Sequence, residues 1–150
     1  MLKEKLQTLG IALPALAGPF GAYIPAKVSE SLLFVAGQLP MKDGKLLAIG
    51  QVPSRCSIDQ ARLAARQCVI NALAAAQTAV DLDRIVGVVR VGAFISSDAS
   101  FTQQPLIANA ASELLIELFG EPGKHVRAAV GVNVLPLDAS VEIDVIFSVD

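Results

Sequence analysis

Residues 126–149 read VRAAVGVNVLPLDASVEIDVIFSV, and this stretch decides the class of the fold. Its first half alternates with the period of a β-strand, and one face carries Val126, Ala128, Val130, Val132 and Val134. The other face carries Arg127, Ala129, Gly131 and Asn133. In its second half Val141, Ile143, Val145 and Phe147 alternate with Glu142 and Asp144. Pro136 to Asp138 predicts a turn between two strands, and if these strands pair, Glu142 lies on the strand next to Arg127.

The preceding half of the chain predicts a strand, a turn and a long helix. Leu32 to Gln38 is a mostly apolar run that indicates a buried strand, and Asp43–Gly44 predicts a hairpin-type turn into the short apolar stretch Leu46 to Ile49. Ser57 and Gln60 have the spacing of a capping box and predict a helix that ends near Val80. Its small residues allow close packing on a sheet; they are Ala61, Ala64, Ala65, Cys68, Ala72, Ala75 and Ala76.

Between this helix and the last two strands, Arg84 to Ser96 is rich in Val and Ile and predicts a long strand. A second helix is expected from Thr102 or Pro105 to Phe119, where Gly120 ends it. The order β-β-α-β-α-β-β predicts a single α+β domain over residues 1–150, with two helices on one face of a mixed sheet.

The composition is unusually apolar, with 53% hydrophobic and 17% charged residues, against about 25% charged in a typical domain. From Lys27 onward charged residues interrupt the apolar runs before they reach the roughly 18 residues of a membrane span. We therefore expect the excess apolar surface to be buried against copies of the same chain, and no membrane partner.

The uncharged segment Leu9 to Ala26 superficially resembles a signal peptide. Its three prolines and three glycines would break the helical core that such a signal needs, so we read it as a loop and expect a cytoplasmic protein. The net charge of −2, without a basic cluster, argues against a nucleic-acid partner.

The usual catalytic and metal-binding motifs are absent. Cys56 and Cys68 do not form a CxxC pair and are expected to be free thiols, with Cys68 on a buried helix face. The single histidine, His125, lies in a Pro/Gly/Lys turn that does not favour a catalytic role. No metal and no cofactor is expected, so any catalysis has to use an arginine, a carboxylate, a tyrosine and backbone groups.

Arg127 is the unusual residue on its otherwise small, apolar strand face. A guanidinium presents a planar fork of donors suited to a carboxylate, and the small neighbours Ala129 and Gly131 leave room for a ligand. The alternative is an ordinary ion pair between Arg127 and Glu142, which periodicity alone favours.

Several of these segments resemble the RidA/YjgF reactive intermediate deaminase family. Residues 127–136 (RAAVGVNVLP) followed by 141–143 (VEI) are similar to the family's C-terminal signature, and residues 34–40 (FVAGQLP) to its strand that closes in Gly-Gln-Leu/Ile-Pro. Tyr23 lies at the family's spacing before Gly37. Asn109 resembles its helix asparagine, and residues 109–115 and 119–127 are typical of the branch labelled endoribonuclease L-PSP-like.

The resemblance implies a chorismate-mutase-like fold, a homotrimer with ligand clefts between subunits, and hydrolytic deamination of reactive enamines and imines derived from amino acids, without a cofactor. It implies that Arg127 holds the substrate carboxylate and that Glu142 positions the attacking water. Tyr23, Gly37, Asn109 and Ala129 would line the cleft. The deaminases commonly carry a cysteine at the position of Ala129 and often a glutamate at that of Gly131.

These two departures leave a second hypothesis open, a non-catalytic binding protein for small carboxylates such as 2-keto acids. A third hypothesis, endoribonuclease activity, rests only on the family's label and is disfavoured by the lack of a basic patch.

Overall fold

Five strands form one mixed sheet in the order β1-β2-β7-β5-β6 in the computed structural model, which describes residues 1–16 and 20–150. The strands are β1 (Ala26–Ser29), β2 (Leu32–Gln38), β5 (Ile85–Ser96), β6 (Val126–Val132) and β7 (Val141–Val149). Only β5 and β6 run parallel, because α3 (Gln104–Phe119) connects them as a crossover; the other neighbours are antiparallel. The sheet is therefore mixed, as predicted.

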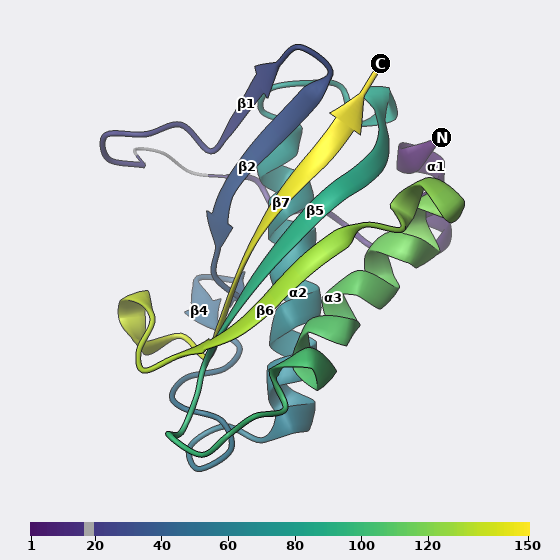
Figure 1. Cartoon of the computed structure of the whole chain (residues 1–150). Coiled ribbons are helices and arrows are strands. Elements are labelled where there is room, and N and C mark those ends of the chain that lie inside the picture. The colour runs from purple at the N-terminus through teal and green to yellow at the C-terminus, as the bar shows by residue number, and fades with distance from the viewer. Residues whose placement is uncertain (17–19) are drawn as a thin grey trace.

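Helix α2 (Ile58–Ala76) and α3 cover one face of this sheet, and Figure 1 shows both behind it with no helix in front. The short α1 (Leu2–Thr8) contacts α3 and the 3-10 helix η1 (Leu82–Arg84). Two further 3-10 helices flank β6, namely η2 (Glu121–Gly123) and η3 (Pro136–Asp138). The α+β class with two helices on one face is confirmed.

The long helix begins where the sequence predicted, because the Ser57 hydroxyl accepts a hydrogen bond from the Gln60 backbone N–H at 3.1 Å. The other half of the capping box is wrong, since the Gln60 side chain donates to the Leu47 carbonyl at 3.0 Å instead. The small residues of α2 are fully buried, as expected of a helix packed closely on a sheet. Its last regular residue is Ala76, and looser turns continue to Val80.

The expected pairing of the last two strands is wrong, because β5 lies between β6 and β7. Residues 133–140 carry the chain past the end of β5 before β7 begins. The physical reason is the connection: α3 crosses over between β5 and β6 and makes them parallel neighbours, so β6 occupies the edge of the sheet, where its Val126 is 67% exposed.

The N-terminal half differs in smaller ways. Strand β1 was missed at the end of the segment read as a loop, and the rest of that segment is irregular where it is described; residues 17–19 lie outside the described residues. The Asp43–Gly44 turn is confirmed and joins β3 (Met41–Lys42) to β4 (Lys45–Leu46), with both turn residues at positive φ. The apolar stretch beyond Leu46 forms no regular strand, although Ile49 bridges to Ala139.

The uncovered face of the sheet carries large apolar side chains. Phe34 of β2 is 42% exposed, and Val126 and Val130 of β6 are 67% and 45% exposed. Their register partners Ile146, Arg90 and Phe94 share this face. No helix among the described residues is long and apolar enough to cross a bilayer.

Candidate functional site

Arg127 points to the helix-covered face of β6 and is held there by α3. Its Nη1 donates to Asn109 Oδ1 at 2.8 Å and to Ser112 Oγ at 3.2 Å. Both Nη1 hydrogens are therefore used, and within residues 1–16 and 20–150 no acceptor is bonded to Nη2 or Nε and no carboxylate lies within 4 Å. The edge formed by Nε and Nη2 is the one that can hold a carboxylate in two parallel bonds.

Ala129 lies two residues further along the same face of β6, opposite Ala93 of β5, and is half-buried. We call Arg127, Asn109 and Ala129 the arginine half-site. A Cβ at residue 131 would lie 2.6 Å from Gln104 Nε2, the flexible end of a side chain of α3. Gly131 itself is exposed, and that it makes room for a ligand stays a prediction.

Glu142 points to the uncovered face, where its register partner on β5 is Phe94. Partial burial raises the pKa of the Glu142 carboxyl, and the neighbouring Asp144 carboxylate raises it further. Asp144 has a cation of its own, Arg90, at 3.5 Å, and in the described part of the chain Glu142 has no ion-pair or hydrogen-bond partner. A half-buried carboxylate of this kind is suited to hold a water and to exchange a proton with it.

Gly37, at the end of β2, lies directly against Glu142. A Cβ at residue 37 would be 2.7 Å from Glu142 Oε2, so only a glycine leaves that carboxylate in place. Tyr23 is 58% exposed, and its ring packs near that of Phe20 with centroids 6.3 Å apart. Tyr23 and Gly37 both line one groove, whose lining does not include Glu142. We call Glu142 and Gly37 the glutamate half-site, and a role of Tyr23 in it stays a prediction.

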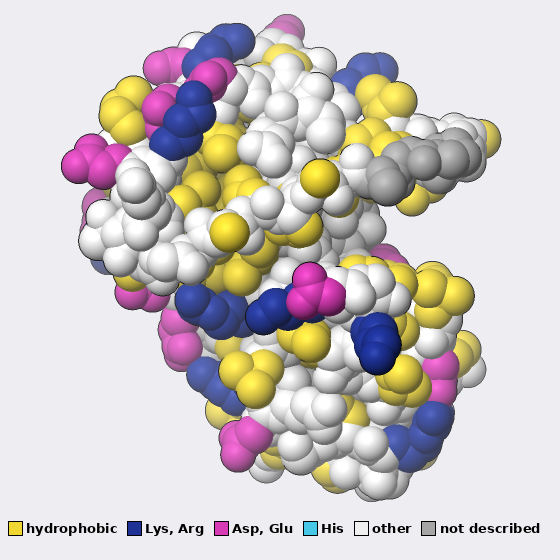
Figure 2. Space-filling model, turned by 180° about the vertical axis from the view of Figure 1, so that it is seen from behind, with side chains coloured by type: hydrophobic (Ala, Val, Ile, Leu, Met, Phe, Trp, Pro, Cys, Tyr) yellow, Lys and Arg dark blue, Asp and Glu magenta, His cyan; other side chains and the backbone are white. Residues whose placement is uncertain are grey.

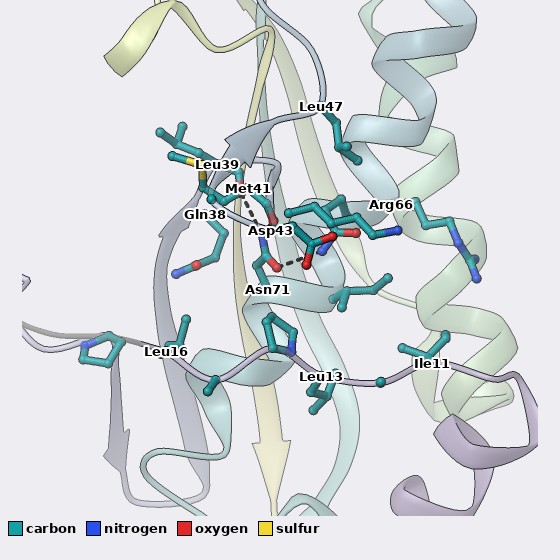
Figure 3. A pocket seen from close by; sticks show the side chains of 18 of the residues that line it. Ile11, Leu13, Leu16, Gln38, Leu39, Met41, Asp43, Leu47, Arg66 and Asn71 are labelled. Atoms are coloured by element: carbon teal, nitrogen blue, oxygen red, sulfur yellow. Dashed lines mark hydrogen bonds between the residues drawn. The ribbon is translucent and has the colours of Figure 1, made fainter.

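The groove lies between the N-terminal arm (residues 9–16 and 20–25 where described) and α2, with a volume of about 1400 Å³. Figure 2 shows it as a deep hollow with hydrophobic side chains inside and charged side chains at its edge. Asn71 of α2 points into it and donates to the Leu39 and Met41 carbonyls, each at 2.9 Å (Figure 3). These bonds fix the backbone that follows Gly37.

The two half-sites do not meet within one chain. Arg127 pairs in register with Val91 and Glu142 with Phe94, which are three residues apart on β5, so the side chains point to opposite faces. Standard strand spacing and rise place their Cα atoms roughly 14 Å apart. The alternative of an Arg127–Glu142 ion pair is therefore excluded within one chain.

Two residues beside Arg127 were not predicted. Ser112 Oγ also contacts His125 Nε2 at 2.8 Å, and His125 Nδ1 lies 2.7 Å from the Gly123 carbonyl oxygen. Helical spacing could have indicated Ser112, which lies three residues after Asn109 on the same face of α3. Nothing in the sequence pairs His125 with it, because the contact joins the end of a turn to the middle of a helix.

The remaining candidates stay outside both half-sites. Cys68 is fully buried, as expected, and burial raises the pKa of its thiol, while Cys56 is also buried and free. Among the residues that the structure describes, no group of three or more His, Cys, Asp or Glu side chains could hold a metal ion.

Comparison with known proteins gives consistent matches. Residues 3–148 match the family model described as "YjgF/chorismate mutase-like, putative endoribonuclease". Protein TCP17 of Trypanosoma cruzi is 43% identical over 141 residues, which cover 93% of this chain and 88% of that protein.

Two solved structures extend over almost the whole chain. The protein Atu1372 of Agrobacterium tumefaciens, of unknown function, has a TM-score of 0.88 and 41% identity, covering 99% of this chain and 93% of that one. A "putative endoribonuclease" of Shewanella oneidensis has a TM-score of 0.92 and 30% identity, covering 99% of both chains.

Proposed function

The chain belongs to the YjgF/chorismate mutase-like family, and from that premise we propose that it hydrolyses reactive enamines and imines derived from amino acids at a cleft between subunits of a homotrimer. The observation that carries this proposal is the hydrogen bonding of the Arg127 guanidinium. Its guanidinium is fixed through Nη1 by Asn109 and Ser112, while the Nε–Nη2 edge has no partner among the described residues. An oriented fork of donors without an acidic partner fits a small carboxylate ligand.

The separation of the two half-sites on opposite faces of the sheet supports the proposal that copies of the chain assemble to form the site. The arginine half-site lies at the β6 edge of the sheet, and the glutamate half-site lies near the opposite edge, between β2 and β7. A second copy that brings its β2 end against the first copy's β6 edge would complete the site. The exposed Phe34, Val126 and Val130 supply apolar surface for such a contact.

The chemistry follows from the two half-sites together. Arg127 holds the carboxylate, so the C=N carbon of the imine is presented to the neighbouring copy's Glu142. Glu142 accepts a hydrogen bond from a water and takes its proton as the oxygen attacks that carbon. The proton then passes to the nitrogen, which gives a carbinolamine. Glu142 next takes the hydroxyl proton and passes it to the nitrogen as the C–N bond breaks, so ammonia leaves and the carbon becomes a keto group. Partial burial and the nearby Asp144 carboxylate raise the pKa of Glu142, which suits a carboxylate that both accepts and returns a proton.

The test is incubation with freshly generated 2-aminoacrylate, following ammonia and pyruvate release. The proposal is supported if the parent protein accelerates the release of ammonia and pyruvate and if Arg127→Ala and Glu142→Gln each abolish this acceleration. Release at the uncatalysed rate, while pyruvate still binds to the parent protein, rejects the catalytic part of it. We also propose that the protein acts in the cytoplasm.

A second function, keto-acid binding without catalysis, is favoured by one observation. Ala129 offers no thiol beside Arg127, at the position where the deaminases commonly carry a cysteine. In that case Arg127 still anchors the carboxylate, and calorimetry with pyruvate or 2-oxobutanoate detects binding without any release of ammonia.

A further inference from the structure

The side chains behind Arg127 form one continuous chain of hydrogen bonds whose direction is fixed at its far end. The Gly123 carbonyl oxygen can only accept, so His125 Nδ1, 2.7 Å away, carries a hydrogen and donates it. In the neutral ring Nε2 is then an acceptor, and the Ser112 hydroxyl, at 2.8 Å, donates to it. This leaves the Ser112 oxygen free to accept from Arg127 Nη1 at 3.2 Å.

Every donor in this chain meets one acceptor, and the order is Arg127 to Ser112 to His125 to Gly123. We propose that Ser112 and His125 are positioning residues for Arg127, which hold its guanidinium so that the Nε–Nη2 edge faces the ligand. The proposal rests on the function proposed above for Arg127. It adds a role for the single histidine, which the carboxylate chemistry itself does not use.

Ser112 prevents rotation of the Arg127 guanidinium plane. Asn109 alone would hold Nη1 through one bond, about which the guanidinium plane can still turn. The second bond, to Ser112, fixes both Nη1 hydrogens and hence the orientation of the plane. Paired bonds to a carboxylate need that plane to be aligned, so a loose guanidinium binds less tightly even though its charge is unchanged.

The contribution of His125 depends on its protonation state. A proton on Nε2 would turn this nitrogen from an acceptor into a donor toward Ser112 Oγ, which already accepts from Arg127. The Ser112 hydroxyl hydrogen would lose its partner, and a second positive charge would lie at the end of the chain that leads to Arg127. Protonation of the His125 ring should therefore weaken ligand binding.

Few other charges bear on the histidine ring. In the preceding turn Lys124 and Glu121 pair with each other at 2.9 Å. On α3, Glu113 pairs with Arg62 of α2, and Glu117 lines a second groove, between α2 and α3, together with both. On β6 the charged residue is Arg127 itself, reached through Ser112.

Binding of pyruvate by calorimetry tests the proposal with four variants, each checked first for assembly and melting temperature. Ser112→Ala should weaken binding roughly three- to ten-fold, and Ser112→Thr, which keeps the hydroxyl, should restore it to within about two-fold. His125→Phe should weaken binding at pH 8 and remove most of the pH dependence. Thr78→Ala, which removes a hydroxyl bonded to the Ala75 carbonyl just after α2 and far from Arg127 in the sequence, is the control and should bind like the parent.

The outcomes separate this proposal from the one on which it rests. If Arg127→Ala binds pyruvate like the parent, the carboxylate function fails and the positioning role fails with it. If Arg127→Ala loses binding while Ser112→Ala and His125→Phe keep it, only the positioning role is rejected. If acid still weakens pyruvate binding in His125→Phe but no longer in Glu142→Gln, the pH dependence belongs to Glu142, and the positioning role of His125 is rejected. Labelling of Ser112 by a fluorophosphonate would make it a nucleophile and overturn the proposal.

Discussion

Arg127 and Glu142 point to opposite faces of the central sheet, with β5 between their strands. Arg127 is oriented by Asn109 and Ser112 of α3, and Glu142 lies against Gly37 on the uncovered face. Neither residue has an ion-pair partner in the described parts of the chain. The predictions below depend on this separation, because each half-site can be altered without touching the other.

Arg127→Lys should lose keto-acid binding almost as completely as Arg127→Ala. Lysine keeps the charge but cannot donate to Asn109 and Ser112 while holding a carboxylate in two parallel bonds, so the loss should be about 2–5 kcal/mol, or roughly thirty- to several-thousand-fold in affinity. Calorimetry with pyruvate or 2-oxobutanoate measures it. A loss of only about 0–1 kcal/mol, as for an exposed ion pair, would remove Arg127 from the site.

Two inactive variants should complement each other when mixed, provided that the site is shared between copies. In mixed trimers of Arg127→Ala and Glu142→Gln, about a quarter of the clefts combine an intact arginine with an intact glutamate. We expect ammonia release to recover to that level after the mixture is dissociated and reassembled. Sedimentation should first show a trimer, and a stable monomer at micromolar concentration would contradict the shared site.

Gly37→Ala should lower the rate of imine hydrolysis about tenfold or more while it changes the Michaelis constant little. The added Cβ would lie 2.7 Å from Glu142 Oε2 and would displace that carboxylate, whereas the carboxylate anchor at Arg127 is untouched. The backbone of Gly37 is not in the left-handed region, so we expect a change in unfolding free energy below about 1 kcal/mol.

Gly92→Ala provides the matched control for this change. It lies on the same face of the sheet, and its Cβ would displace Asp144 and Arg90 instead of Glu142. Gly92→Ala should therefore lower the rate of hydrolysis less than Gly37→Ala does. Equal losses in both variants would show that the effect of Gly37→Ala does not depend on Glu142.

Glu142→Gln should raise stability modestly at neutral pH, and the gain should vanish in acid. Burial raises the pKa of Glu142 in the folded state above its unfolded value, so ionisation costs stability above the folded pKa and costs nothing below the unfolded one. Because the carboxylate is half-exposed, the gain should stay below about 1 kcal/mol. Urea unfolding of the parent and of Glu142→Gln at pH 4 and pH 7.5 measures this gain in unfolding free energy. An equal gain at both pH values would contradict the prediction.

RNA binding should be weak, because the net charge is −2 and the sequence has no basic cluster. Fluorescence anisotropy with a labelled oligoribonucleotide at two salt concentrations measures it. Tight binding that falls steeply with added salt would instead favour the endoribonuclease hypothesis.

The sequence by itself determined most of the secondary elements and the start of the long helix. The Ser57 cap, the Asp43–Gly44 turn and the alternating faces of β6 and β7 depend on local backbone and side-chain chemistry, so they could be read from neighbouring residues. Arg127 could be singled out in the same way, since it is the one charged residue on a small apolar strand face. The choice of Glu142 and of the other site residues needed the family resemblance.

Only the tertiary structure decided which strands are neighbours and what surrounds each site residue. Strand β5 pairs with both β6 and β7, and the register of these pairings places Arg127 and Glu142 on opposite faces. The contacts of Ser112 with Arg127 and His125 join a helix to a strand and a turn more than ten residues away. Such contacts follow from how the whole chain buries its apolar surface, and the spacing of residues along a single element carries no record of that arrangement.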